Sequence, residues 1–160
     1  MFTLMTPTQE LLALRQRGGF RELSNHSLIE LSGAEAAKFL QARLSNDVFA
    51  LQVGQGQMSA LLDRKAHIIA YFSLHRLTDN QFLMLIESSQ TATVLKDLET
   101  YHFQEKVDYT TLECKLWSVQ GGTAPLLVPN LPELGIQKLE PTGDILIRRS
   151  LTGDIGYVLA

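Results

Sequence analysis

A run of alternating side chains in the middle of the chain carries the groups best suited to bind a ligand. Residues 67–77 read as a β-strand, and alternation places Tyr71, Ser73 and His75 on one face, opposite an apolar face. An aromatic ring can stack on a flat molecule, and hydroxyl and imidazole groups can hydrogen-bond to it. The sequence therefore predicts that this is the wetter face, either as the wall of a ligand pocket or as an ordinary half-exposed sheet surface.

Three further polar residues lie next to predicted turns or helix ends. Glu87 closes an apolar strand just before a predicted helix, so it either caps that helix or contacts a ligand. Asn46 and Asp47 follow another predicted helix, where bonds from side chain to backbone typically stabilise a turn. The four histidines lack the spacing of a metal site, and local motifs yield no Ser/His/Asp arrangement. We assign no catalytic residue and no metal ligand.

Composition narrows the class of protein. With 160 residues, of which 45% are hydrophobic and 19% charged, the chain has the size and balance of one globular domain. The net charge is −3 and the basic residues are scattered, which argues against nucleic acid as a partner. A single cysteine favours a reducing compartment, and no apolar run approaches the roughly 20 residues of a membrane span. We expect a cytoplasmic protein that binds neither nucleic acid nor membrane.

The hydrophobic periodicity predicts an α+β fold, with a mostly antiparallel sheet and helices packed on one face. Thr6 opens a first helix through a capping box with Gln9. A similar box, Ser32 with Glu35, opens a second helix that ends near Leu44. A third helix is predicted at 89–101, and strands at 27–31, 57–62, 67–77, 82–87, 112–119, 144–150 and 156–159.

The last predicted strand ends on Tyr157-Val158-Leu159-Ala160. An apolar strand with an unpaired edge invites association with another chain. We therefore expect that the sequence is a fragment of a longer protein, or that a partner chain covers this edge.

Five short motifs follow one another in a characteristic order: Leu31-Ser32-Gly33-Ala34-Glu35-Ala36, Phe39-Leu40-Gln41, Leu44-Ser45-Asn46-Asp47-Val48, Leu61-Leu62-Asp63 and Arg149-Ser150-Leu151-Thr152-Gly153-Asp154-Ile155-Gly156-Tyr157. Together they resemble the folate-binding domain shared by glycine-cleavage aminomethyltransferases and by YgfZ-type proteins, which are implicated in iron–sulfur cluster maintenance. The resemblance implies that residues 1–160 form the N-terminal portion, about half, of an aminomethyltransferase-like folate-binding domain.

The resemblance also implies a pocket for tetrahydrofolate or a derivative, formed by His26, Asn46, Asp47, Met58, Tyr71, Ser73, His75 and Glu87. In aminomethyltransferases, a tyrosine stands at the position of Met58, an aspartate at that of Tyr71 and a glutamate at that of Val158. A carboxylate can anchor N–H groups or assist proton transfer, whereas valine can do neither. YgfZ-type proteins also lack the aspartate and have a glutamate matching Glu87, so the resemblance favours that branch.

Three functions follow as hypotheses. The first is a tetrahydrofolate-binding protein of YgfZ type that supports iron–sulfur cluster assembly or repair without being an enzyme. The second is a folate-dependent aminomethyltransferase of the glycine cleavage system, using acids such as Asp47 and Glu87. The third is a dimerising half-domain without ligand, by analogy with the homodimeric folate domain of the tRNA-modification GTPase TrmE. The expected partners are a folate and either a second copy of the chain or a missing C-terminal half.

Overall fold

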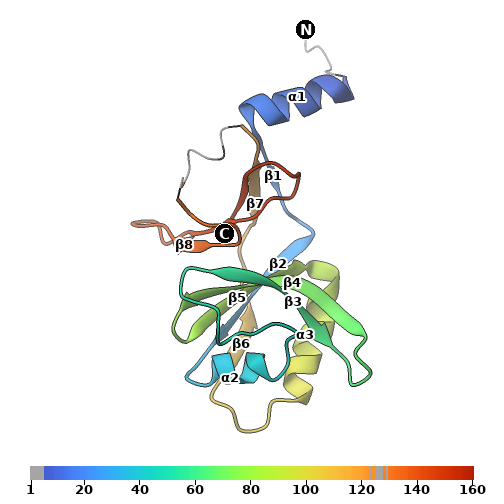
Figure 1. Cartoon of the computed structure of the whole chain (residues 1–160), viewed down its shortest axis with the longest axis vertical. Coiled ribbons are helices and arrows are strands. Elements are labelled where there is room, and N and C mark those ends of the chain that lie inside the picture. Colours follow the sequence, from blue (N-terminus) through green and yellow to red (C-terminus); the bar gives the residue numbers. More distant parts are fainter. Residues whose placement is uncertain (1–5, 123, 125–127, 129) are drawn as a thin grey trace.

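Two five-stranded antiparallel sheets form the body of the protein, seen in a computed structural model that describes residues 6–122, 124, 128 and 130–160 (Figure 1). In the first sheet the strand order is β3 (Gly56–Leu62), β4 (Ile68–Thr78), β5 (Gln81–Glu87), β2 (His26–Ser32) and β6 (Asp108–Thr111). In the second sheet it is β1 (Gly19–Glu22), β7 (Trp117–Gln120), β10 (Gly156–Leu159), β9 (Ile145–Arg148) and β8 (Ile136–Lys138). The predicted α+β class is confirmed.

The first sheet packs one face against two helices, α2 (Ala36–Gln41) and α3 (Ser88–Thr100). Phe72 of β4 is buried in this layer. Helix α3 buries Val94 and Leu98, which are four residues apart and therefore share one side of the helix. These side chains belong to the larger part of the apolar core, so α2 and α3 fix the plane of the first sheet.

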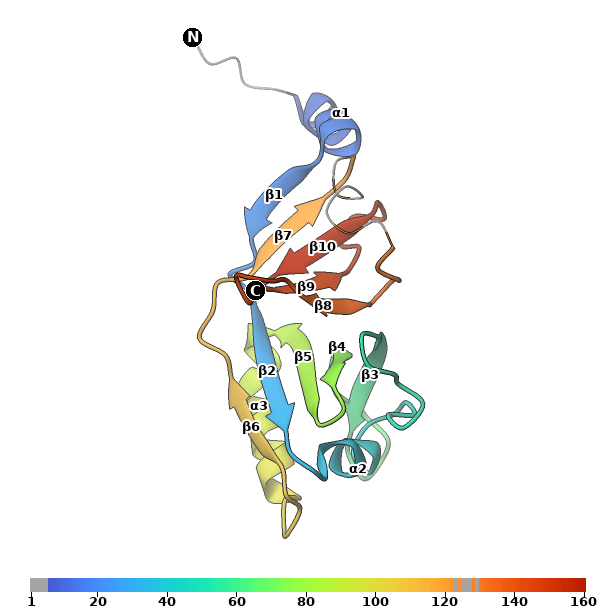
Figure 2. The same cartoon turned by 90° about the vertical axis from the view of Figure 1, so that its left-hand side faces the viewer.

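The other face of the first sheet meets the second sheet (Figure 2). Leucines from β2 and β5 pack there against apolar side chains of the second sheet and of the segments that enter it. The members of this layer are Leu23, Leu28, Leu83, Leu85, Leu116, Ile136, Ile147 and Val158. The sheets are thus joined by an apolar layer, and polar residues of the same two faces lie next to it.

Helix α1 (Pro7–Arg17) projects from the end of the second sheet (Figures 1 and 2). Its predicted capping box is confirmed, because the Thr6 N–H donates to Gln9 Oε1 at 2.9 Å and the Gln9 N–H to Thr6 Oγ1 at 3.3 Å. The second predicted box is wrong. Ser32 remains in β2, α2 begins after Glu35 without a side-chain cap, and the Glu35 carboxylate accepts the backbone N–H of Lys106 instead.

The predicted strand 112–119 is confirmed only in its last three residues, and three short strands were missed. Residues 112–116 link the two sheets, since β6 ends at Thr111 and β7 begins at Trp117. Leucines at the two ends of this link are tied to the sheets: the Leu112 N–H donates to Leu28 O, and Leu116 O accepts the Leu23 N–H. The missed strands, β1, β6 and β8, have three or four residues each, too few to show a clear alternation.

The expected bare edge at the end of the chain is also wrong. Strand β10 lies inside the second sheet, with β7 on one side and β9 on the other. The outer strands of that sheet are β1 and β8, and Phe20 of β1 is 76% exposed. In the described residues no helix is long and apolar enough to cross a membrane.

Candidate functional site

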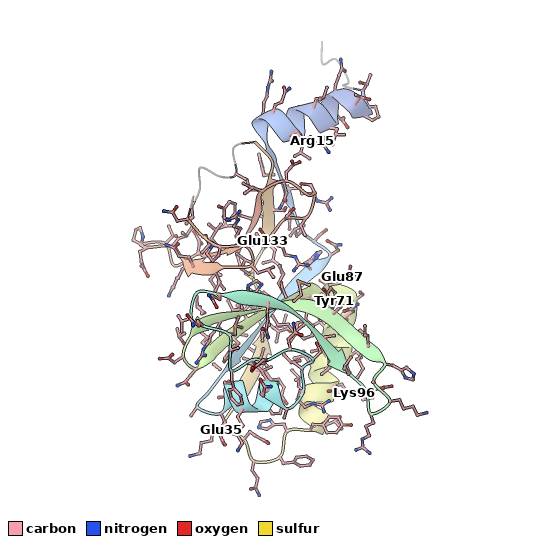
Figure 3. The ribbon with its side chains drawn as sticks, in the orientation of Figure 1. Arg15, Glu35, Tyr71, Glu87, Lys96 and Glu133 are labelled. Atoms are coloured by element: carbon pink, nitrogen blue, oxygen red, sulfur yellow. The ribbon has the colours of Figure 1, made fainter. Side chains whose placement is uncertain are left out.

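Six of the eight predicted folate-binding residues come together on the face of the first sheet that is turned toward the second. Strand register places Met58 opposite Ser73, Ser73 opposite Leu85, and His26 opposite Glu87. Alternation then puts Tyr71 on the same face as Ser73, toward the junction between the sheets, where Figure 3 shows Tyr71 and Glu87. Four strands therefore contribute side chains to one surface.

Ser73 and His75 are on the predicted face, but that face is not open where they lie. Both are 0% exposed, so the prediction of a wet surface at these two positions is wrong. The His75 Nδ1–H donates to Leu134 O at 2.9 Å, which leaves Nε2 to accept the Ser73 hydroxyl at 2.9 Å. Burial lowers the pKa of His75 to about 4, so the imidazole is neutral near pH 7. The pair forms the buried floor of the site.

Tyr71, by contrast, is 56% exposed on the same strand. Its ring is free to stack on a planar molecule, whereas its backbone N–H is held by Gln90 Oε1 at 3.4 Å. Glu87 is exposed as well, and its side chain makes no capping hydrogen bond to α3. Glu87 occupies the N-cap position of α3, as the capping alternative predicts, but its carboxylate is not used in a hydrogen bond to the helix.

Asn46 and Asp47 lie beside the edge strand β3 and form the turn that their residue types predicted. Asp47 Oδ1 accepts the backbone N–H groups of Phe49 at 2.9 Å and Ala50 at 3.2 Å. Asn46 Nδ2 donates to the carbonyl of Met58 at 2.5 Å. Asn46 thus fixes the backbone of a predicted pocket residue, and the carboxylate of Asp47 is already used within its own turn.

Arg149 is the residue of the site that the sequence reasoning missed. It follows β9 in the second sheet and reaches across to the first, where Nη1 lies 3.1 Å from the thioether sulfur of Met58. The signal that could have found it is the pair Arg148-Arg149, because strand alternation sends the two side chains to opposite faces. Arg148 indeed turns the other way, toward Leu131 O and Glu133.

Burial and the Arg149 guanidinium both disfavour the charged form of His26. Burial first, and then the charge of Arg149, lower the pKa of His26, while Glu87 acts in the opposite direction. Burial also lowers the pKa of Arg149 itself, and Tyr71 and Glu133 oppose that effect. His26 is thus favoured in its neutral form, in which one ring nitrogen can accept and the other donate.

A cavity of about 390 Å³ opens beside His26, between β1, β7, the end of α1 and the loop before β10. Its walls are largely apolar, with polar groups from both sheets. The lining residues include Leu14, Phe20, Arg21, His26, Gln120 and Leu151. The loop wall is held in place because the Leu151 N–H donates to Gln120 Oε1 at 3.0 Å.

The chain is similar in sequence to known proteins. A family model described as the GCVT N-terminal domain matches residues 4–138. The chain belongs to this family. The aminomethyltransferase of Bacillus subtilis (strain 168) is 26% identical over 151 residues, which are 91% of this chain and 42% of that protein. An uncharacterised protein of Haemophilus influenzae is 30% identical over 111 residues, 69% of this chain and 40% of its own length.

Solved structures agree with this membership of the GCVT N-terminal domain family. The glycine cleavage system aminomethyltransferase T from Bartonella henselae superposes with a TM-score of 0.85 at 25% identity, over 98% of this chain and 46% of that one. A chain of the heterotetrameric sarcosine oxidase from Corynebacterium sp. U-96 shares the fold, with a TM-score of 0.58 at 14% identity. The chain spans less than half the length of the aminomethyltransferases, so it corresponds to their N-terminal part.

Proposed function

We propose that the chain binds tetrahydrofolate or a close derivative between its two sheets, without transferring a one-carbon group, in the manner of YgfZ-type proteins. The observation that carries the proposal is the meeting of His26, Met58, Tyr71 and Glu87 with Arg149 beside an open cavity. Membership of the GCVT N-terminal domain family supports a folate as the ligand.

The residues present fit a reduced folate. A cavity of about 390 Å³ lies within the roughly 300–1,000 Å³ typical of small-molecule sites. The exposed ring of Tyr71 offers a stacking surface for a pteridine, and Arg149 Nε is a buried donor without a partner in the described residues. His26 adds a neutral imidazole at the junction of cavity and sheet face.

Three residues of the site are unsuited to transfer of a one-carbon group. Val158 is buried in the apolar layer between the sheets, where the resemblance would place a carboxylate. Tyr71 occupies the position of the aspartate, and a phenol is a far weaker base than a carboxylate at neutral pH. Asp47 is held in its turn by two backbone N–H groups. Binding is therefore better supported than proton transfer.

Calorimetry with tetrahydrofolate and the 160-residue chain tests the proposal. We expect saturable binding with a Kd below about 1 mM, which corresponds to roughly 4 kcal/mol. Tyr71→Ala should weaken this binding, whereas Lys96→Ala, on the exposed side of α3 and remote from Tyr71 in Figure 3, should not. Absence of measurable heat at millimolar folate, both for the chain alone and after a C-terminal half from a relative is added, contradicts the proposal.

The competing hypothesis of aminomethyl transfer has one observation in its favour, the name that several relatives carry. Glu87 is the exposed carboxylate on the site face that could serve it. An assay with a methylamine-loaded carrier protein and tetrahydrofolate separates the two functions. Turnover that Glu87→Gln abolishes would establish transfer, and folate binding without turnover supports the proposal.

We further propose that residues 1–160 are half of a folate-binding domain, completed either by a second copy or by a C-terminal half. The share of the relatives' length that the chain covers and the exposure of Phe20 beside the cavity support this. Sedimentation of the 160-residue chain with and without tetrahydrofolate tests it. A dimer favours a second copy. A monomer that binds folate only after a C-terminal half from a relative is added favours the other arrangement.

A role in iron–sulfur cluster assembly or repair is the finer part of the proposal and rests on the resemblance to YgfZ-type proteins. We expect cells without this protein to lose activity of iron–sulfur enzymes. Wild-type protein should restore that activity, and Tyr71→Ala should not. Restoration by both forms would separate the cellular role from folate binding.

A further inference from the structure

The backbone of Arg149 is fixed on both sides, which gives its side chain a defined origin. Its N–H donates to Gly156 O at 2.9 Å, and its carbonyl accepts Gln120 Nε2 at 3.1 Å. Gln120 is itself buried and also holds Ser118 Oγ at 3.0 Å. Arg149 therefore projects from a rigid part of the second sheet.

The guanidinium at the end of this side chain is poorly partnered for a half-buried cation. Nη1 contacts the Met58 sulfur, and a thioether is a weak acceptor. The Nε atom is buried, and within the described residues it has no hydrogen-bond partner. None of the ion pairs in the described residues includes Arg149, since Glu133 pairs with Arg148 instead. Buried donors without acceptors cost free energy, so a ligand that supplies an acceptor oxygen gains on binding.

The surroundings indicate the kind of acceptor. Nη1 contacts Met58, which lies opposite Ser73 and therefore diagonal to Tyr71 on the same face of the sheet. An acceptor that binds this guanidinium therefore lies on a ring stacked on Tyr71, or next to it.

We propose that Arg149 donates to the carbonyl oxygen at position 4 of a pteridine stacked on Tyr71, and that it selects 4-oxo over 4-amino pteridines. This inference rests on the proposed folate binding. A 4-amino group would point a second donor at the guanidinium and leave its N–H groups unpaired. Arg149 is therefore a specificity-determining residue.

Folic acid and aminopterin test this directly, because the two compounds carry the same side chain and differ only at position 4. Calorimetry at about pH 7 keeps both pteridine rings largely uncharged. Wild-type protein should bind folic acid about ten- to a hundredfold more tightly than aminopterin, the range that one unpaired buried donor produces. Arg149→Met keeps an unbranched side chain but removes the charge and the donors, and it should bring the ratio of the two affinities close to one. The control Lys96→Met should keep the wild-type ratio.

The outcomes are distinguishable. Equal affinity of wild-type protein for the two compounds overturns the inference and leaves folate binding intact. A preference for folic acid that persists in a folded Arg149→Met variant also overturns the inference. Arg149→Lys keeps the charge but not the planar guanidinium, so its preference for folic acid should lie between those of the wild type and of Arg149→Met. If wild-type protein binds neither compound, the inference is overturned, whereas the proposed function is decided separately by calorimetry with tetrahydrofolate.

Discussion

The two faces of the first sheet are built from the same strands, yet different interactions stabilise them. Toward α2 and α3, β4 presents Ala70, Phe72 and Leu74, all buried in one apolar layer. Toward the second sheet, the intervening positions are Tyr71 and Ser73, one exposed and one buried in a hydrogen bond. One face gains free energy from apolar area, whereas the other relies on individually placed polar contacts.

This difference separates stability from binding along a single strand. Removing a side chain from an apolar layer leaves a cavity, which lowers the free energy of unfolding. The residues of this layer therefore determine whether the sheet folds. Polar contacts are local and depend on protonation and geometry, so they determine what the sheet can recognise. Substitutions on the helix side should therefore change unfolding, and substitutions at the open end of the other face should change ligand affinity.

The largest effect is expected for Phe72→Ala. The side chain is 1% exposed, and its removal leaves a cavity between β4 and the helices. We expect a loss of about 3–5 kcal/mol in the free energy of unfolding, measured by urea denaturation. The control is Ile68→Ala on the same strand, which is 67% exposed and should cost less than about 0.5 kcal/mol. Similar losses for both would contradict the contrast between the faces.

The next effect is a dependence of stability on pH that comes from His75. Burial lowers its pKa from 6.5 to about 4, so between these values the unfolded chain binds a proton that the folded protein does not. The free energy of unfolding is therefore not reduced by His75 above about pH 6.5, and it decreases as the pH falls toward 4. The decrease amounts to about 3 kcal/mol at 1.36 kcal/mol per pKa unit. Urea denaturation at about pH 7.5 and pH 4 measures it.

His75→Gln provides the control for this pH dependence. Glutamine can still donate and accept hydrogen bonds but does not titrate, so the variant should keep more of its stability on acidification than the wild type does. The lowered pKa of His26 acts in the same direction and remains in the variant. Identical pH profiles for the two proteins would show that His75 is not the titrating group.

A smaller loss is expected for Gly56→Ala at the edge of the first sheet. A Cβ atom there would lie 2.1 Å from Leu134 O and 2.3 Å from His75 Nδ1, so the loop before β8 would have to move. We expect a loss of about 1–3 kcal/mol, the usual cost of overpacking. Gly153→Ala is the comparison, because among the described residues no atom lies within 4 Å of the added Cβ, and an alanine there is strained only by the backbone angle φ of +88°. A loss at Gly56 no greater than that at Gly153 would argue against close packing of the sheets.

The sequence predicted the helix-side layer better than the face between the sheets, for a physical reason. Apolar alternation in β4 and the period of α3 are local, and the observed bounds differ from the predicted ones by a single residue at each end. The burial of Ser73 and His75 depends on Leu134, some sixty residues further along the chain. Alternation identifies a face, but it carries no information on what covers that face.

Arg149 was missed for a related reason. Its contact with Met58 joins residues 91 positions apart and belongs to no local pattern. The resemblance drew attention to the Thr152-Gly153-Asp154 hairpin, which contributes Thr152 to the cavity wall. Arg149 opens the stretch that carries this part of the resemblance, but the motif assigns it no contact with a ligand. The local signal was the pair Arg148-Arg149, whose side chains alternate between the two faces of the sheet.

The smallest effect on stability is expected for Tyr71→Ala, and it is the sharpest test of the comparison. The ring is 56% exposed, and its loss should change the free energy of unfolding by less than about 0.5 kcal/mol. Tetrahydrofolate affinity should fall about tenfold, since aromatic stacking is worth roughly 0.5–1.5 kcal/mol. Phe72→Ala should show the reverse, with large destabilisation and unchanged affinity in the fraction that remains folded. If Tyr71→Ala left affinity intact, the polar face would be an ordinary sheet surface, because the group best placed to hold a ring would contribute nothing to binding.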